Sequence, residues 1–114
     1  MRHPTGAPVT AIEDEVQDSQ RIGRRYTEFL RVPALSAGVY VLPAGAVDGQ
    51  SPHTEDEIYY VVRGRGRFRS GDKDRAAGPG DVFHVPARMP HEFHSIAEEL
   101  VLFVVFAPPE QPPP

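Results

Sequence analysis

The chain contains no cysteine among its 114 residues. This absence excludes a disulfide framework, a thiolate zinc site and a cysteine nucleophile. It is compatible with a reducing compartment, and we expect a cytoplasmic protein.

Long apolar segments are missing as well. The longest apolar run, residues 100–107, has eight residues, whereas a membrane-spanning helix needs about 20. The first four residues are not followed by an apolar core. We therefore expect neither a signal peptide nor insertion into a membrane.

A basic excess is also absent, because 12 Lys and Arg face 16 Asp and Glu and the net charge is −4. The one basic cluster alternates with uncharged residues and consists of Arg63, Arg65, Arg67 and Arg69. On a strand these side chains would share one face. Without an aromatic-basic motif, the cluster favours a solvated strand face and argues against a nucleic-acid partner.

The length predicts one domain, which we place at residues 13–107 after a flexible N-terminal tail of residues 1–12. Proline occupies positions 108, 109, 112, 113 and 114. Proline neither pairs within a sheet nor continues a helix, so residues 108–114 are expected to form a flexible C-terminal tail.

Tyr26, Phe29 and Leu30 follow helical spacing, which predicts one or two helical turns ahead of the domain core.

From residue 35 to residue 107 the pattern predicts strands alone. β-rich runs are separated by turn residues that include Pro43, Gly64, Gly71 and Pro86. Strands that recur about every 8–12 residues indicate a sandwich or barrel. Strands do not alternate with helices, which excludes a parallel sheet.

Two of these predicted strands, residues 58–62 and 100–106, are apolar on both faces. A strand with one wet face alternates polar and apolar residues, so both faces of these strands should be covered. One face can line the interior, and the other needs the N-terminal segment or a second subunit. The pattern therefore predicts a homodimer.

His53, Glu57 and His91 each lie beside turn-forming residues and next to a β-rich run. Two imidazoles and one carboxylate form the facial ligand set that holds non-haem iron with open positions. In a straight strand His53 and Glu57 would lie about 13 Å apart, too far to share a metal. We therefore expect a turn at residues 54–56, with His53 ending one strand and Glu57 starting the next.

These residues resemble the two motifs of the cupins, which are small jelly-roll barrels. In the first motif three residues separate His53 from Glu57, and Gly64 follows after six more. In the second, Pro86 and His91 stand at the family spacing from Gly80. The resemblance covers about residues 45–107. It implies an all-β double-stranded β-helix, or jelly-roll barrel, with a divalent metal (Fe, Mn, Ni or Zn) in its mouth.

Three positions depart from the cupin pattern. Ser51 stands where the family has a further histidine, Arg88 replaces a glycine, and Ser95 replaces an asparagine. The resemblance implies four ligands, of which this chain keeps three. Ser51 holding a water and Gln50 reaching in from a bulged strand are the two alternatives for the fourth position, and a weakened or empty site is a third.

Tyr59 and Phe93 share the strand faces of Glu57 and His91, so each is either core packing or a pocket wall. His84 is expected to be a packed histidine or a pocket residue beside the site. Cupins include oxygenases, isomerases, lyases and non-catalytic binding proteins. The sequence favours a metal-dependent oxygenase-type enzyme acting on a small organic molecule. A non-enzymatic binding or sensing cupin is the alternative, and no catalytic residue is identified.

Overall fold

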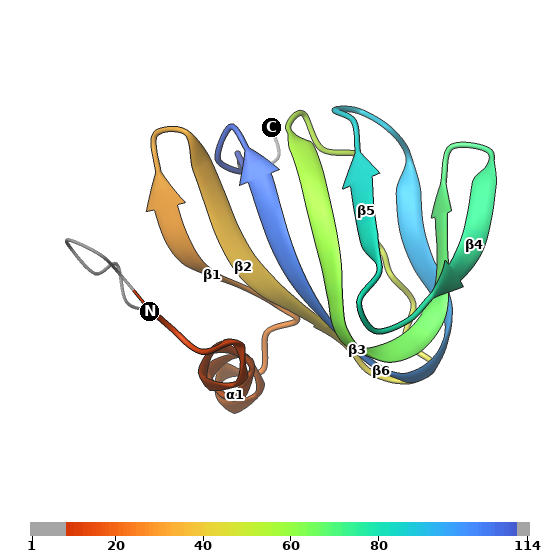
Figure 1. Cartoon of the computed structure of the whole chain (residues 1–114), viewed down its shortest axis with the longest axis horizontal. Helices are drawn as coiled ribbons and strands as arrows, with labels where there is room; N and C mark the ends of the chain where they lie inside the picture. Colours follow the sequence, from red (N-terminus) through yellow and green to blue (C-terminus); the bar gives the residue numbers. More distant parts are fainter. Residues whose placement is uncertain (1–8, 112–114) are drawn as a thin grey trace.

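The structure, a computed structural model, describes residues 9–111 as one helix followed by six strands. Figure 1 shows the strands side by side in one strongly curved sheet. The elements are α1 Ile12–Ile22, β1 Tyr26–Val32, β2 Leu35–Leu42, β3 Asp56–Ser70, β4 Lys73–Ala77, β5 Val82–Val85 and β6 His91–Ala107. The prediction of an all-β fold with a short N-terminal helical or extended segment is confirmed.

The sheet has the strand order β1-β2-β6-β3-β4, and β5 pairs with the first half of β3. All pairs are antiparallel, and the long strands β3 and β6 shift register between Val61 and Arg67. Such bulges bend a strand. At this bend Gly64 has φ 96°, and a Cβ there would lie 2.0 Å from the Glu99 carbonyl oxygen. The glycine of the first motif is therefore required by the curvature of the barrel.

The helical turns predicted at residues 26–30 are wrong, because this segment is strand β1 and pairs with β2. The register of the pair shifts between Glu28 and Leu30. Because a bulge of this kind breaks the alternation of side chains along a strand, the apolar residues Tyr26, Phe29 and Leu30 have a spacing that is also typical of a helix. The helix lies earlier, at α1, where three acidic residues occupy the first turn and Gly23, with φ 74°, ends the last. Residues 1–8 of the predicted N-terminal tail lie outside the described residues.

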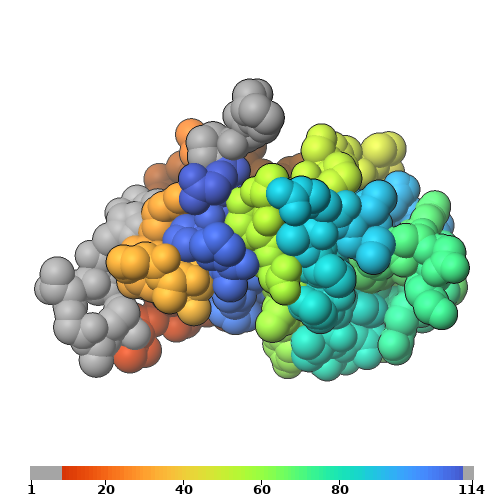
Figure 2. Space-filling view, turned by 90° about the horizontal axis from the view of Figure 1, so that it is seen from above, coloured from red at the N-terminus to blue at the C-terminus, as the bar shows by residue number. Residues whose placement is uncertain are grey.

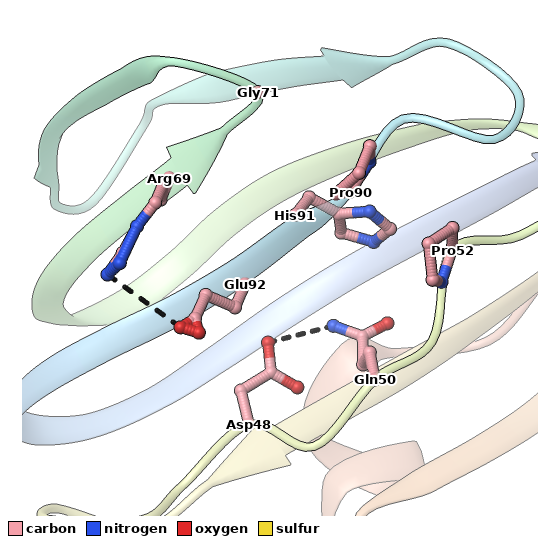
Figure 3. A pocket seen from close by; sticks show the side chains of 8 residues that line it. All are labelled: Asp48, Gln50, Pro52, Arg69, Gly71, Pro90, His91 and Glu92. Carbon is pink, nitrogen blue, oxygen red and sulfur yellow. Dashed lines mark hydrogen bonds and ion pairs between the residues drawn. The ribbon is translucent and has the colours of Figure 1, made fainter.

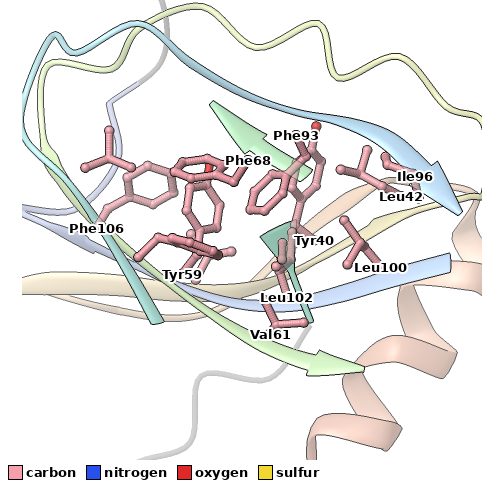
Figure 4. Close-up of a cluster of buried hydrophobic side chains, with 14 residues drawn as sticks. Tyr40, Leu42, Tyr59, Val61, Phe68, Phe93, Ile96, Leu100, Leu102 and Phe106 are labelled. Carbon is pink, nitrogen blue, oxygen red and sulfur yellow. The ribbon is translucent and has the colours of Figure 1, made fainter. Parts of the chain in front are cut away.

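Aromatic and aliphatic side chains fill the inside of the barrel (Figure 4). The rings of Tyr59 and Phe93 are fully buried, with centroids 4.9 Å apart, and Phe68 lies 4.5 Å from Phe93. Tilted and edge-to-face contacts of this kind add to the burial of the rings. Tyr59 and Phe93 therefore belong to the core that closes the barrel beneath its mouth.

Helix α1 covers part of the outer face of the sheet. Val16 of the helix packs against Val39 of β2 and Val101 of β6. The N-terminal segment thus covers one of the two strands that are apolar on both faces. On β3, Ile58 and Tyr60 stay 45% and 42% exposed in the single chain. Within residues 9–111 no helix has the length and apolar character needed to cross a membrane.

Candidate metal centre

The three predicted ligands meet at the mouth of the barrel. His53, Glu57 and His91 each offer one ligand atom, and these atoms lie within 4.8 Å of one another. Glu57 Oε1 is 3.2 Å from His91 Nε2 and 3.9 Å from His53 Nε2. With metal bonds of about 2.1 Å, neighbouring ligand atoms of a facial set lie about 3 Å apart. The spacing of the three side chains is therefore close to that of a metal site.

Glu57 and His91 are both carried by strand ends. Glu57 is the second residue of β3 and His91 the first of β6, and both side chains are 1% exposed. His91 Nδ1 donates a hydrogen bond to the Met89 carbonyl at 2.8 Å. This bond leaves the lone pair on Nε2, which faces Glu57. The ring is thus held in the tautomer that a metal ligand requires.

While the His91 imidazole is neutral, its contact with Glu57 is not a hydrogen bond, whereas a protonated ring would donate from Nε2 to Glu57, which helps to raise the pKa of His91. With Nδ1 protonated, Nε2 and Oε1 are both acceptors, and neither atom has a hydrogen-bond partner among the described residues. Leaving a buried polar atom unsatisfied costs about 1–3 kcal/mol. A cation between the two atoms would satisfy both, so these residues fit the metal that their ligand types imply.

The electrostatics of the site favour positive charge. Burial lowers the pKa of the His91 imidazole, but the Glu57 carboxylate and the Met89 carbonyl raise this pKa by more, so that it lies above its usual value. The same field that attracts a proton to Nε2 attracts a metal cation.

His53 lies on a loop and not at the end of a strand, which corrects the prediction. β2 ends at Leu42, and residues 43–55 form neither helix nor strand. Proline at positions 43 and 52 cannot donate to a strand ladder. Instead, the amide of Arg88 donates to the His53 carbonyl at 2.6 Å. Arg88 has φ 66°, so it keeps the left-handed conformation for which the cupin pattern uses glycine.

Gln50, and not Ser51, reaches the ligands. Gln50 Oε1 is 3.1 Å from His53 Nε2 and accepts a hydrogen bond of 3.0 Å from the Tyr59 hydroxyl. Ser51 is exposed. In Figure 3 Gln50 lies across from His91, with its amide nitrogen turned toward Asp48. Of the two alternatives for the fourth position, the geometry favours Gln50.

Asp48 anchors the loop that carries Gln50 and was not expected from the sequence. Its side chain is buried and accepts hydrogen bonds from the Tyr40 hydroxyl at 2.6 Å, the Phe93 amide at 2.8 Å and Gln50 Nε2 at 2.9 Å. Three donors orient the carboxylate, which in turn orients the Gln50 amide. No motif distinguishes Asp48 from other acidic loop residues, so sequence patterns could not identify it.

Two hollows open beside the ligands. One encloses about 200 Å³ and is lined by Tyr26, Tyr40, Gln50, His53, Glu57, Val104, Phe106 and Glu110. The other, drawn in Figure 3, encloses about 280 Å³ and is lined by Asp48, Gln50, Pro52, Arg69, Gly71, Pro90, His91 and Glu92. The candidate metal centre therefore lies between two spaces that a small molecule could enter.

Sequence patterns did not identify two residues that line the first hollow, Tyr26 and Glu110. The Tyr26 hydroxyl is buried and has no hydrogen-bond partner among the described residues. Burial, together with the carboxylates of Glu57, Glu55 and Glu28, raises the pKa of Glu110 to about 7. The sequence placed Tyr26 in a helix and Glu110 in a loose tail, so neither was considered for the site.

His84 lies apart from the ligands. Its side chain is exposed and its Nε2 lies 3.3 Å from Asp56. It lines neither hollow beside the ligands but a separate one of about 410 Å³. Alternation in β5 turns Phe83 inward and His84 outward. His94 Nε2 lies within hydrogen-bond distance of Asp74 Oδ2, at 2.8 Å, also away from the ligands.

The family model described as a cupin domain matches residues 38–106. The chain belongs to the cupin family. This cupin is 46% identical over 85 residues to an uncharacterized protein of Streptomyces coelicolor, and the match covers 75% of this chain and 81% of that protein.

Solved structures share the fold of this cupin. KdgF from Halomonas sp. matches with a TM-score of 0.67 and 26% identity over 73% of this cupin and 76% of that chain. The DMSP lyase DddQ from Ruegeria pomeroyi has a TM-score of 0.65 and 25% identity over 76% of this cupin and 49% of that chain. A Bacillus halodurans protein has a TM-score of 0.78 and 20% identity over 96% of this cupin and 87% of that chain. The predicted jelly-roll barrel is confirmed.

Proposed function

We propose that this cupin binds one divalent transition metal, Fe, Mn, Ni or Zn, through His53, Glu57 and His91 and acts on a small organic molecule. The observation that carries the proposal is the buried pair of Glu57 Oε1 and His91 Nε2, two acceptors 3.2 Å apart without a donor between them. The bound metal would supply a Lewis acid with open coordination positions. An oxygenase-type reaction is the proposed activity.

Gln50 is the proposed fourth ligand. Its amide oxygen lies 3.1 Å from His53 Nε2, and Asp48 holds the amide nitrogen through a bond of 2.9 Å. The donor that faces the ligands is therefore the oxygen, which is the only atom of an amide that binds cations well. Ser51 is exposed and is the weaker candidate.

The proposed substrate is small and not anionic. The hollow beside His53 encloses about 200 Å³, less than the roughly 300–1,000 Å³ typical of ligand pockets. Val104 and Phe106 give it an apolar wall, and neither lysine nor arginine occurs among its described lining residues. The unpartnered hydroxyl of Tyr26 is suited to donate to a substrate oxygen.

Two other activities are alternatives for the same site. One structural relative is described as a DMSP lyase, which supports a metal-dependent lyase as the alternative reaction. Non-enzymatic binding or sensing is the second alternative. It is favoured by Tyr59, whose pKa is raised well above its usual value by burial and by the Glu57 carboxylate. A phenol of that kind is a poor proton carrier near neutral pH.

Elemental analysis of protein purified without chelators tests the metal. We expect about one transition-metal ion per chain. A protein that holds no metal, and also takes up none of Fe²⁺, Mn²⁺, Ni²⁺ or Zn²⁺ after dialysis, would favour the binding alternative. Oxygen consumption by the Fe²⁺-loaded protein with small neutral alcohols, aldehydes and ketones would separate an oxygenase from a lyase.

We also propose a homodimer formed through the outer face of β3 and β5. Ile58, Tyr60 and Val82 are 45%, 42% and 60% exposed there, and Tyr60 pairs directly with Val82. Obligate interfaces are apolar and bury upwards of about 2,000 Å². Light scattering at micromolar concentration should give twice the chain mass, and Tyr60→Glu should halve it. A monomeric wild-type protein would contradict the dimer.

A cytoplasmic location also stays a prediction.

A further inference from the structure

The segment that follows β6 is attached to the barrel, although the sequence predicted a loose tail from residue 108 onward. Pro109 is buried, and the Glu110 amide donates to Ser36 Oγ at 2.9 Å. Arg31 Nη2 donates to the Glu110 carbonyl at 3.0 Å. In Figure 2 this dark blue end of the chain lies between the orange β1–β2 pair and the yellow-green β3. Both backbone groups of Glu110 are thus held in place, and residues 112–114 lie outside the described residues.

The next residue adds a further attachment. The Gln111 amide donates to Glu55 Oε2 at 3.3 Å, and the Glu55 side chain is buried. These contacts come from β1, β2 and the loop before β3, which are distant in sequence from residue 110. The position of the Glu110 side chain is therefore set by the folded barrel.

The Glu110 carboxylate points at a proposed metal ligand. Glu110 Oε2 lies 3.5 Å from His53 Nδ1, and both side chains line the hollow of about 200 Å³. On the other side of the same imidazole, Gln50 Oε1 lies 3.1 Å from Nε2. Two acceptors thus compete for the single proton of a neutral imidazole. Protonation of Nδ1 leaves Nε2 open to a metal, whereas protonation of Nε2 blocks the site.

We propose that Glu110 is a positioning residue that keeps the His53 proton on Nδ1 and so directs the Nε2 lone pair toward Glu57 and His91. At pH 8, above its raised pKa of about 7, Glu110 is a carboxylate. A carboxylate is a stronger hydrogen-bond acceptor than an amide, so Glu110 prevails over Gln50. For His91 the Met89 carbonyl has the equivalent role. Partners of this kind orient a ligand and raise its basicity, and their loss lowers metal affinity by about 10- to 100-fold. The inference rests on the proposed function, because it assigns His53 to a metal.

Two measurements test the role of Glu110. The first is a Zn²⁺ titration of the full chain after chelator treatment, in which Glu110→Ala should weaken binding about 10- to 100-fold. Glu110→Gln keeps an acceptor oxygen at the same position and should restore most of the affinity. Asp18→Ala is the control, because it removes an exposed carboxylate that pairs with Arg21 on helix α1 at 3.1 Å, away from His53 and Glu110, and should leave Zn²⁺ affinity unchanged.

The second measurement is the tautomer of His53 in the metal-free protein, read from its ring ¹⁵N shifts at pH 8. The wild type should carry the proton on Nδ1, and Glu110→Ala should move it to Nε2. Unchanged affinity together with an unchanged tautomer would overturn the role of Glu110. If the wild type binds no Zn²⁺, the proposed function fails, and the tautomer alone decides whether Glu110 orients His53. Thermal unfolding of each variant verifies that it is folded.

Discussion

The candidate metal centre has two halves that are built differently. Glu57 is the second residue of β3 and His91 the first of β6, and their side chains are 1% exposed. His53 stands on a loop and is 19% exposed. Its position depends on the Arg88 amide at 2.6 Å and on Gln50 at 3.1 Å. The strand half derives its geometry from the sheet, and the loop half derives it from contacts between distant segments.

The difference shows in how the polar atoms are satisfied. On the strand half, Glu57 Oε1 and His91 Nε2 have no partner among the described residues. On the loop half, Asp48 and Gln50 exchange hydrogen bonds with their neighbours at 2.6–3.1 Å. A rigid sheet can hold unsatisfied groups in place for a cation, whereas a loop needs a satisfied network to hold any position at all.

The largest expected effect is the loss of metal when the strand half is broken. His91→Ala removes a ligand from a three-ligand set and should weaken Zn²⁺ or Fe²⁺ binding by about 100-fold or more. This is a larger loss than the one expected for removing a residue that only hydrogen-bonds a ligand. His94→Ala is the control, because His94 pairs with Asp74 at 2.8 Å and should keep full metal content by elemental analysis. A His91→Ala variant with full metal content would contradict the site.

The second prediction compares two tyrosines, one on each side of the loop network. The Tyr40 hydroxyl donates to buried Asp48 at 2.6 Å, so Tyr40→Phe should lower the free energy of unfolding by about 2 kcal/mol. The Tyr26 hydroxyl has no partner among residues 9–111, so Tyr26→Phe should leave stability unchanged or raise it slightly. Urea unfolding of the metal-free proteins measures both. Equal losses in the two variants would show that the Asp48 network does not stabilise the loop.

The two halves also differ in how far the sequence predicts them. Glu57, His91 and Gly64 follow from motif spacing, because residues on paired strands have fixed geometry and a left-handed glycine marks a bend. His53 follows from the same spacing, but the sequence placed it at the end of a strand and the structure places it on a loop. Asp48 and Glu110 could not be found that way. Each of these residues reaches the site only when segments far apart in sequence come together in the fold. A single sequence has no periodic pattern that identifies such contacts.

The third prediction concerns the fourth ligand position, where the sequence pattern and the structure disagree. The cupin pattern places the missing histidine at Ser51, but Ser51 is exposed and Gln50 Oε1 lies 3.1 Å from His53 Nε2. Gln50→His should therefore tighten Zn²⁺ binding by about tenfold, or about 1.4 kcal/mol, because imidazole is the better ligand for this metal. Ser51→His should change little. The opposite ranking in calorimetric titrations would mean that the loop rearranges when metal binds.

The smallest expected effect is the pH dependence of stability in the metal-free protein. The pKa of His91 is raised, because the Glu57 carboxylate and the Met89 carbonyl together outweigh burial, which lowers it. Burial and neighbouring carboxylates raise the pKa of Glu110 from 4.5 to about 7. Both groups bind a proton more tightly in the folded than in the unfolded chain. Their contribution to stability is complete below the unfolded pKa values and is lost as pH rises through the folded ones.

The melting temperature of chelator-treated protein should therefore fall between about pH 5 and pH 8. Asp56 and Asp74 do not offset this trend, because their pKa values are lowered from 3.8 and their contribution is lost only below the measured range. Glu110→Gln removes one of the two raised groups and should flatten the profile, while Asp18→Asn, which removes an exposed carboxylate paired with Arg21 on helix α1, should not. Because Glu110 is 28% exposed, solvent screening keeps its share small. A melting temperature that rises over this range would contradict the raised pKa values of His91 and Glu110.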